Sequence, residues 1–201
     1  LTTPVDHEPP EEGWPAVLLV PGPMASDRDG TISGVPVLGE LAGALADAGF
    51  LVARYDRRGI GQSGGRPESA GIREYAEDAR SMVRYLDRRD NVDDDRITVL
   101  GQAEGGWTAM LTAARERRTD NLVLVGAPSN TGADLVLEQQ SALLDQLDVS
   151  ATERAERIRL QEQIIDALLD DGPWDGVPDE MRVQADSIWF RSFLEFDAAD
   201  T

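Results

Sequence analysis

The stretch that decides the fold of this chain reads ITVLGQAEGGWTAML and spans residues 97–111. Its first four residues form an apolar run that predicts a short strand, and residues 107–118 predict a helix. Gly101 and Gly105 flank the turn between the two, where the backbones of strand and helix must come close together. A strand that leads through a tight turn into a helix predicts one step of a parallel α/β sheet.

The same alternation of strand and helix extends to both sides of this stretch. Apolar runs predict further strands, and apolar residues at helical spacing predict further helices. The strands are expected at 16–20, 50–55 and 121–125, and the helices near 38–45 and 75–86. We therefore predict an α/β fold, a mostly parallel sheet with helices on both faces, for a core over residues 1–131.

The pattern changes at residue 132, after which no further strand is predicted. Residues 135–147 and 153–169 read as helices with acidic faces. The second carries an apolar stripe of Ile158, Ile165 and Leu169, which Ile164 and Leu168 widen. A last segment holds several aromatic residues between 189 and 196. We expect residues 132–201 to form a helical cap whose interior holds the apolar part of a ligand, with ordinary covering helices as the alternative.

The turn at residues 101–105 has the spacing of the nucleophile elbow, G-x-S-x-G, in which a serine stands exposed at the tip of a strained turn. Gly101 and Gly105 match this pattern, but the centre is Ala103, which has no hydroxyl group. A non-glycine residue in such a conformation costs about 1–3 kcal/mol, which an enzyme tolerates because the strain aims the nucleophile. Since the surrounding glycines are intact, a deliberate substitution or a recent loss is favoured over an old decay of the site.

Further motifs occur in the same order as in a known superfamily. They lie at 21–30 after the first strand, at 54–63 after the second, at 93–106 around the elbow, and at 126–128 after the fourth strand. With these motifs, the chain resembles the α/β-hydrolase superfamily over roughly residues 16 to 130. The resemblance is to the esterase and peptidase-like group related to dienelactone hydrolases and prolyl oligopeptidases.

The resemblance assigns roles to individual residues. Ala103 occupies the position of the nucleophile, and the backbone N–H of Glu104 is expected to donate to the oxyanion. The second oxyanion donor is expected in the loop that begins at Gly22. Because proline has no N–H, Met24 rather than Pro23 is the expected donor.

Polar residues near these loops are expected to have structural roles. Asp56 and Ser63 would satisfy the backbone groups of the glycine-rich turn that follows the second strand. The run Asp27-Arg28-Asp29 predicts either an ion-pair clamp on the oxyanion loop or solvated surface charges.

The resemblance also implies an acid and a histidine after the nucleophile, but the only histidine, His7, precedes the first strand. His7 is expected to be an exposed histidine in a linker. We therefore expect these 201 residues to be part of a longer chain, with the remaining strands, the acid and the base beyond residue 201 and the start of the sheet before residue 1.

Composition excludes several classes of function. The chain has 38 acidic and 19 basic residues, a net charge of −19, and every basic residue is arginine. Such a chain repels nucleic acids and anionic membranes. With no cysteine and one histidine, thiolate and multi-histidine metal sites are excluded, and no cofactor is expected. The acidic coat resembles that of proteins from extreme halophiles, with a GC-rich coding bias as the alternative, and the absence of a signal or spanning segment predicts a cytoplasmic location.

Two functions remain open. The first is a serine hydrolase of carboxylesterase type that acts on a small ester or acyl substrate through an acyl-enzyme, inactive with alanine at position 103. The alternative is a non-catalytic binding protein on the same scaffold. The sequence predicts neither the identity of the substrate nor the oligomeric state.

Overall fold

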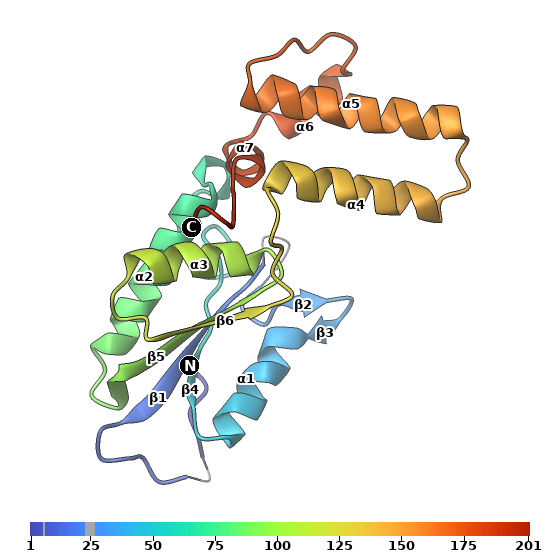
Figure 1. The fold of residues 1–201 in the computed structure, drawn as a ribbon. Coiled ribbons are helices and arrows are strands. Elements are labelled where there is room, and N and C mark those ends of the chain that lie inside the picture. Colours follow the sequence, from blue (N-terminus) through green and yellow to red (C-terminus); the bar gives the residue numbers. More distant parts are fainter. Residues whose placement is uncertain (6, 23–26) are drawn as a thin grey trace. The chain divides into compact units, whose positions relative to one another are not determined.

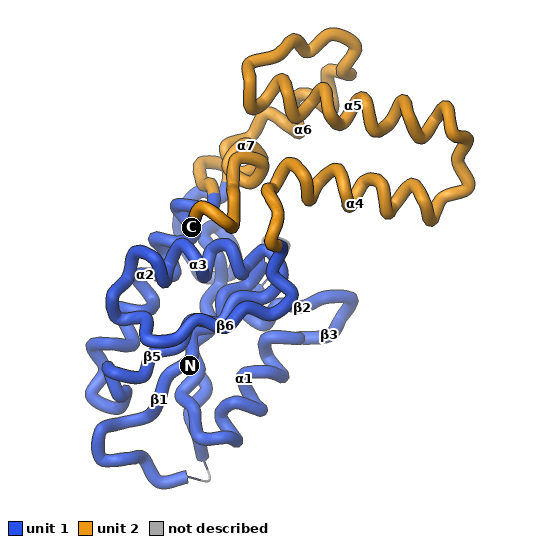
Figure 2. Tube along the Cα trace, in the orientation of Figure 1, with its two compact units in different colours: residues 1–67, 72–128, 201 blue, residues 68–71, 129–200 orange. Residues whose placement is uncertain are grey.

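The computed structural model describes residues 1–5, 7–22 and 27–201 and divides the chain into two compact units. The first unit contains residues 1–67, 72–128 and 201, and the second contains residues 68–71 and 129–200 (Figure 2). Each unit has its own hydrophobic core and is described separately.

The first unit is built on a parallel sheet of four strands in the order β4-β1-β5-β6 (Figure 1). All of β1 is buried, which agrees with its uninterrupted apolar sequence. The registers pair Val17 with Val52 on one side and with Thr98 on the other. The strands are β1 (Trp14–Val20), β4 (Leu51–Ala53), β5 (Val92–Gln102) and β6 (Asn121–Val125).

Helices cover both faces of this sheet. Alternate residues of β1 point to opposite faces: Leu18 packs in the same cluster as Val83, whereas Leu19 packs in the cluster of Leu38. Helix α1 (Val37–Asp47) therefore lies on one face, and α2 (Ile72–Asp87) and α3 (Gly105–Arg115) lie on the other (Figure 1). The predicted α/β class, with a parallel sheet between helices, is confirmed.

Strand β6 differs from the other strands because its apolar residues are exposed. Leu122, Val123, Leu124 and Val125 have between 38% and 48% of their surface exposed. Among the described strands, β6 pairs only with β5, so its other edge is open. The sequence pattern predicted the strand but not its exposure.

Two short elements precede α1 and were not predicted. Strands β2 (Thr31–Ile32) and β3 (Val35–Pro36) form an antiparallel hairpin. Its turn residues Ser33 and Gly34 both have positive φ, at 50° and 84°, which is the combination that a two-residue hairpin turn requires. Strands of two residues carry no periodic signal in the sequence, so only the turn residues could have indicated them.

The second unit consists of helices. Three of the four begin at a side-chain cap, in which Thr131, Ser150 or Ser187 accepts a hydrogen bond from the first turn. Of the predicted apolar stripe, Ile164, Ile165 and Leu168 lie in the core of this unit, whereas Ile158 and Leu169 are only half-buried. The helices are α4 (Gly132–Gln146), α5 (Ala151–Leu169), α6 (Asp179–Ala185) and α7 (Ile188–Leu194).

A short 3-10 helix, η1 (Pro67–Ser69), lies between β4 and α2. Nowhere in the described parts of the chain is a helix both long and apolar enough to cross a membrane.

Candidate functional site

The turn between β5 and α3 places Ala103 in a left-handed conformation. The φ angle of Ala103 is +49°, and among the described residues other than glycine only Ser33 and Asp171 share a positive φ. The N–H of Ala103 donates to the carbonyl of Val125 at 2.9 Å, and its own carbonyl accepts from the N–H of Gly106 at 2.9 Å. A residue with a Cβ atom is strained in the left-handed region of φ and ψ. The contacts around the turn must therefore hold Ala103 in this conformation against a local energetic cost.

The glycines on either side of Ala103 are required by close contacts between backbones. A Cβ atom on Gly101 would lie 2.6 Å from the carbonyl oxygen of Gly105 and from the Cα of Gly106. A Cβ atom on Gly105 would lie 2.7 Å from the carbonyl oxygen of Val20. The spacing of the two glycines therefore reflects a strand, a turn and a helix packed without room for side chains, as the sequence indicated.

Gly22 lies beside the same turn. An added Cβ on Gly22 would meet the carbonyl oxygen of Gln102 at 3.6 Å and the backbone nitrogen of Gly105 at 3.8 Å. The structure thus brings the end of β1 next to the residues around Ala103. Pro23 and Met24, the residues considered for the second oxyanion donor, lie outside the described residues.

Glu104 is the N-cap residue of α3, with φ −63° and ψ −17°. Its carbonyl accepts from the N–H of Trp107 at 3.1 Å. The N–H groups at the start of a helix have no carbonyl partner inside the helix, and the helix dipole makes this end positive. The turn at Ala103 therefore faces the end of α3 at which negative charge is stabilised.

A buried carboxylate fastens the loop that follows β1. Asp56 is 7% exposed, and its oxygens accept from the backbone N–H of Arg28 at 3.0 Å and from the guanidinium of Arg28 at 3.0 and 2.5 Å. Asp56 also accepts from the N–H of Gln62 at 3.4 Å, while Ser63 donates to its carbonyl at 2.6 Å. The hydrogen bonds from Arg28 lower the pKa of the Asp56 carboxyl below its ordinary value despite burial.

The neighbouring acids of this loop also have partners. Asp29 forms an ion pair with Arg54, and its carbonyl accepts from the N–H groups of Leu38 and Gly39 at the start of α1. Asp27 accepts from the hydroxyl and the N–H of Thr31, and the side-chain hydrogen bond from Thr31 lowers the pKa of Asp27. Arg28 thus pairs with Asp56 and Asp29 with Arg54, rather than with each other. Arg54 and Asp56 lie one and three residues after the end of β4.

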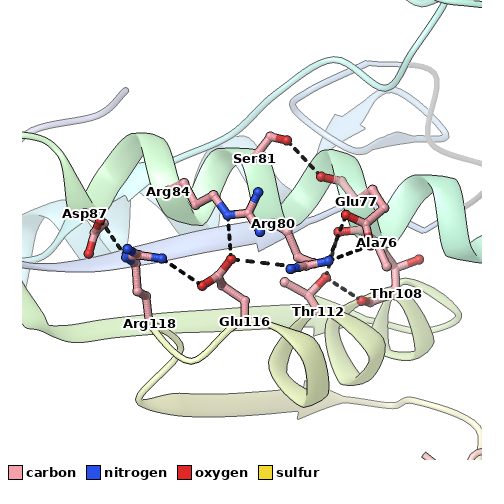
Figure 3. Close-up of polar contacts among 10 residues, drawn as sticks. All are labelled: Ala76, Glu77, Arg80, Ser81, Arg84, Asp87, Thr108, Thr112, Glu116 and Arg118. Carbon is pink, nitrogen blue, oxygen red and sulfur yellow. Dashed lines mark hydrogen bonds and ion pairs between the residues drawn. The ribbon is translucent and has the colours of Figure 1, made fainter.

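A second buried carboxylate, Glu116, was not singled out in the sequence. It is 4% exposed and accepts from Arg84 Nε at 2.8 Å and Arg118 Nη1 at 3.2 Å, with Arg80 Nε at 3.8 Å (Figure 3). Burial alone would raise the pKa of Glu116, but the hydrogen bonds from Arg84 and Arg118 outweigh it and lower the pKa. This cluster joins the end of α3 to α2, so it supports the helix that begins at the turn.

His7 is exposed, and its Nε2 lies 2.7 Å from the carbonyl oxygen of Asp47. Asp47 ends α1 and the chain then enters β4, so this contact lies at the edge of the sheet where the parallel strands begin. Ala103 follows the other end of β5. Over the residues described here, no group of three or more histidine, cysteine or acidic side chains could hold a metal ion.

Residues 29–171 match the protein family described as serine aminopeptidase, S33. This chain belongs to that family, within the α/β-hydrolase superfamily. The match begins near the end of the loop after β1 and covers the turn at Ala103 and all of α4 and α5. The superfamily predicted from the sequence is confirmed.

Curated relatives are longer than this chain. Esterase EstD of Thermotoga maritima is 31% identical over 140 residues, which cover 69% of this chain and 32% of EstD. An uncharacterized protein of Mycobacterium tuberculosis is 36% identical over 96 residues, which cover 48% of this chain and 30% of that protein. The matched part of the chain thus spans about a third of the length of these curated relatives.

Solved structures show the same fold at low sequence identity. The α/β hydrolase GrgF from Penicillium sp. sh18 superposes with a TM-score of 0.59 and 19% identity, over 96% of this chain and 68% of GrgF. A hypothetical protein from Pseudomonas aeruginosa gives a TM-score of 0.55 and 19% identity, over 90% of this chain and 55% of that protein. At this identity, the likeness concerns the fold alone.

Proposed function

We propose that this chain carries the nucleophile position of a serine hydrolase of carboxylesterase type, and that Ala103 stands where the nucleophilic serine belongs. The observation that carries the proposal is the φ angle of +49° at Ala103, between two glycines that admit no side chain. A hydroxyl on the Cβ of residue 103 would stand at the tip of a rigid, strained turn next to the N-terminus of α3. Kinship with a family of serine aminopeptidases and with an esterase supports acyl transfer as the reaction class.

The proposed chemistry proceeds through a covalent acyl-enzyme. The serine oxygen would attack the carbonyl carbon of an ester while a general base takes its proton, and the alcohol would leave with a proton. Water would then attack the acyl-enzyme, releasing the carboxylic acid and restoring the serine. In both steps the N–H of Glu104 would donate to the carbonyl oxygen as it becomes negative.

The helical second unit is proposed as the cap of this hydrolase. Its own core contains aromatic and aliphatic side chains, and Trp189 contacts the ring of Phe193 with 5.1 Å between centroids. Such an element can hold the apolar part of a small ester. The acyl group is the part of the substrate that this proposal leaves to experiment.

The test restores the missing oxygen in the protein at its full natural length. The Ala103→Ser variant is expected to hydrolyse short p-nitrophenyl esters in molar KCl and to gain the mass of one phosphonyl group on reaction with a fluorophosphonate. Ala103→Gly is the matched control, because it keeps the turn and adds no nucleophile. Absence of both activity and labelling in a folded Ala103→Ser variant would overturn the hydrolase proposal.

A second candidate function is a non-catalytic binding protein on the same scaffold. The missing hydroxyl at position 103 favours it, because an intact turn without a nucleophile can still shape a ligand site. This candidate predicts that the natural gene encodes alanine at position 103. A serine codon at this position would contradict it.

A further inference from the structure

A group of arginines lines a pocket at the end of α2. The pocket has a volume of about 760 Å³, and its lining residues come from the last turns of α2 and the connection to β5. They are Ser81, Arg84, Tyr85, Arg88, Arg89, Asp90 and Asn91. All belong to the first unit.

This pocket is separate from the turn at Ala103. Asn91 immediately precedes β5, whereas Ala103 immediately follows it. The strand has 11 residues, which correspond to roughly 30 Å of extended chain. The two sites therefore lie at opposite ends of the same strand.

Arg89 is held in position without a carboxylate. Its Nε donates to Asn91 Oδ1 at 3.1 Å, its Nη1 donates to the Tyr85 hydroxyl at 2.8 Å, and its guanidinium lies 5.5 Å from the centre of the Tyr85 ring. A guanidinium has five N–H donors, so these two hydrogen bonds leave three of them for a ligand. Because the partners in these contacts are neutral, they orient Arg89 without compensating its positive charge.

Arg88 and Arg84 add positive charge on the same side. Arg88 is exposed and forms no ion pair or hydrogen bond with any other residue that the structure describes. Arg84 donates a hydrogen bond from its Nε to Glu116, and its side chain remains 39% exposed. The single acid in the lining, Asp90, neutralises only part of this charge.

We propose that this pocket binds a phosphate group, either as inorganic phosphate or as the phosphate of a small monoester. Within the part of the chain that the structure describes, Arg88 and Arg89 form no ion pair with a carboxylate, and they stand side by side in the lining of one pocket. Planar guanidinium groups donate pairs of parallel hydrogen bonds to phosphate oxygens. A small dianion fits better than a polymer, because the acidic remainder of the surface repels an extended polyanion.

The test titrates the protein with inorganic phosphate at constant ionic strength, with chloride as the replacing anion, and follows binding by calorimetry. Arg88→Gln and Arg89→Gln are each expected to weaken phosphate binding about tenfold, as the loss of a charge-assisted hydrogen bond predicts. Arg88→Gln is the cleaner variant, because Arg88 makes no hydrogen bond or ion pair to a described residue that the substitution would break. Arg73→Gln is the matched control, since Arg73 is exposed on the first turn of the same helix and its loss changes the net charge equally.

A variant that is expected to strengthen phosphate binding serves as a second test, because damage to the fold would weaken binding instead. Asp90→Asn removes the acid of the pocket and is expected to strengthen phosphate binding about threefold by removing a repulsive charge. Tighter binding of phenyl phosphate than of inorganic phosphate would assign the site to a phosphorylated metabolite, and equal binding would assign it to the free ion. Failure of the unaltered protein to bind either, or equal weakening by Arg73→Gln and Arg88→Gln, would overturn the proposal.

Discussion

Arg28 and Asp56 are joined by three hydrogen bonds, two from the guanidinium and one from the backbone N–H of Arg28, to a carboxylate that is almost completely buried. The two residues are 28 positions apart. Asp56 follows β4, and Arg28 lies in the loop between β1 and β2, so the pair ties two loops at the same end of the sheet. The glycine at position 61 belongs to this arrangement, because its added Cβ would lie 2.5 Å from Asp56 Oδ2.

Removing the charge of Asp56 should therefore weaken the fold. Asp56→Asn places an amide where the carboxylate accepts from Arg28, and we expect the free energy of unfolding to fall by about 2 kcal/mol. Urea denaturation at fixed salt measures this change. Asp29→Asn is the control, since the Asp29 carboxylate is more exposed than that of Asp56 and the loss of its pair is expected to cost less than about 1 kcal/mol. Equal losses in the two variants would contradict the special role of Asp56.

The lowered pKa of Asp56 predicts a dependence of stability on acid. Because the pKa in the folded protein lies below the ordinary value of 3.8, the ionised form stabilises the fold at neutral pH. This contribution is complete above the pKa of the unfolded chain and is lost as the pH falls through the folded pKa. The free energy of unfolding, measured at steps from about pH 6 to pH 3, should fall less steeply in Asp56→Asn than in the unaltered protein. Parallel curves would show that Asp56 does not contribute.

The strain at Ala103 should be measurable as stability. Ala103→Gly relieves the left-handed conformation and is expected to raise the free energy of unfolding by about 0.5–1 kcal/mol, after the greater flexibility of unfolded glycine is subtracted. The same substitution at Ala44, an exposed residue of α1, should lower it by about 1 kcal/mol. Thermal denaturation of both variants gives the comparison. A loss of stability in Ala103→Gly would mean that the turn is not strained.

Glycine-to-alanine substitutions should have opposite effects at two sites. Gly101→Ala brings a methyl group within 2.6 Å of two backbone atoms, and we expect a loss of more than about 3 kcal/mol or no soluble protein. Gly43 lies in α1 with no atom within 4 Å of an added Cβ, so Gly43→Ala should stabilise the protein by about 0.5–1 kcal/mol. Urea denaturation measures the free energy of unfolding of both variants. If Gly101→Ala does not fold, the predicted gain in stability of Gly43→Ala is still measured. A mild effect of Gly101→Ala would contradict the packing described for the turn.

Salt should stabilise the fold, because the carboxylates repel one another when they are not screened. With a net charge of −19, transfer from molar to 50 mM KCl is expected to cost roughly 1 kcal/mol, or about 3 °C in the melting temperature of a chain of this size. Sorbitol at matched osmolality is the control, since it does not screen charge. Equal melting temperatures in the two KCl solutions would refute the halophilic interpretation of the composition.

Local sequence patterns predicted those parts of the fold that depend on residues close together in the chain. The strain at Ala103 follows from the spacing of Gly101 and Gly105, and β1 follows from its continuous apolar run. The sequence did not reveal that β5 begins at Val92, because Asp93, Asp94 and Asp95 break the apolar pattern while the backbone still belongs to the strand. The register of β1 with β5 shifts between Trp14, which pairs with Val92, and Ala16, which pairs with Ile97. The charged residues of β5 lie in this irregular stretch, so the apolar pattern alone makes the strand begin too late.

Contacts between distant residues were harder to predict. The pairing of Arg28 with Asp56 and the gathering of three arginines around Glu116 depend on how the loops and helices fold back on the sheet. In a sequence rich in both acids and arginines, many pairings are compatible with the same pattern of charges. The Glu116 cluster carries a signal only at the end of α3, where a single glutamate stands between arginines.

In a preparation of these 201 residues, the free edge of β6 would offer its backbone and apolar side chains to a second molecule. Salt that screens the carboxylates would at the same time weaken the repulsion between two such molecules. Light scattering recorded beside each melting curve therefore separates association of this preparation from its unfolding.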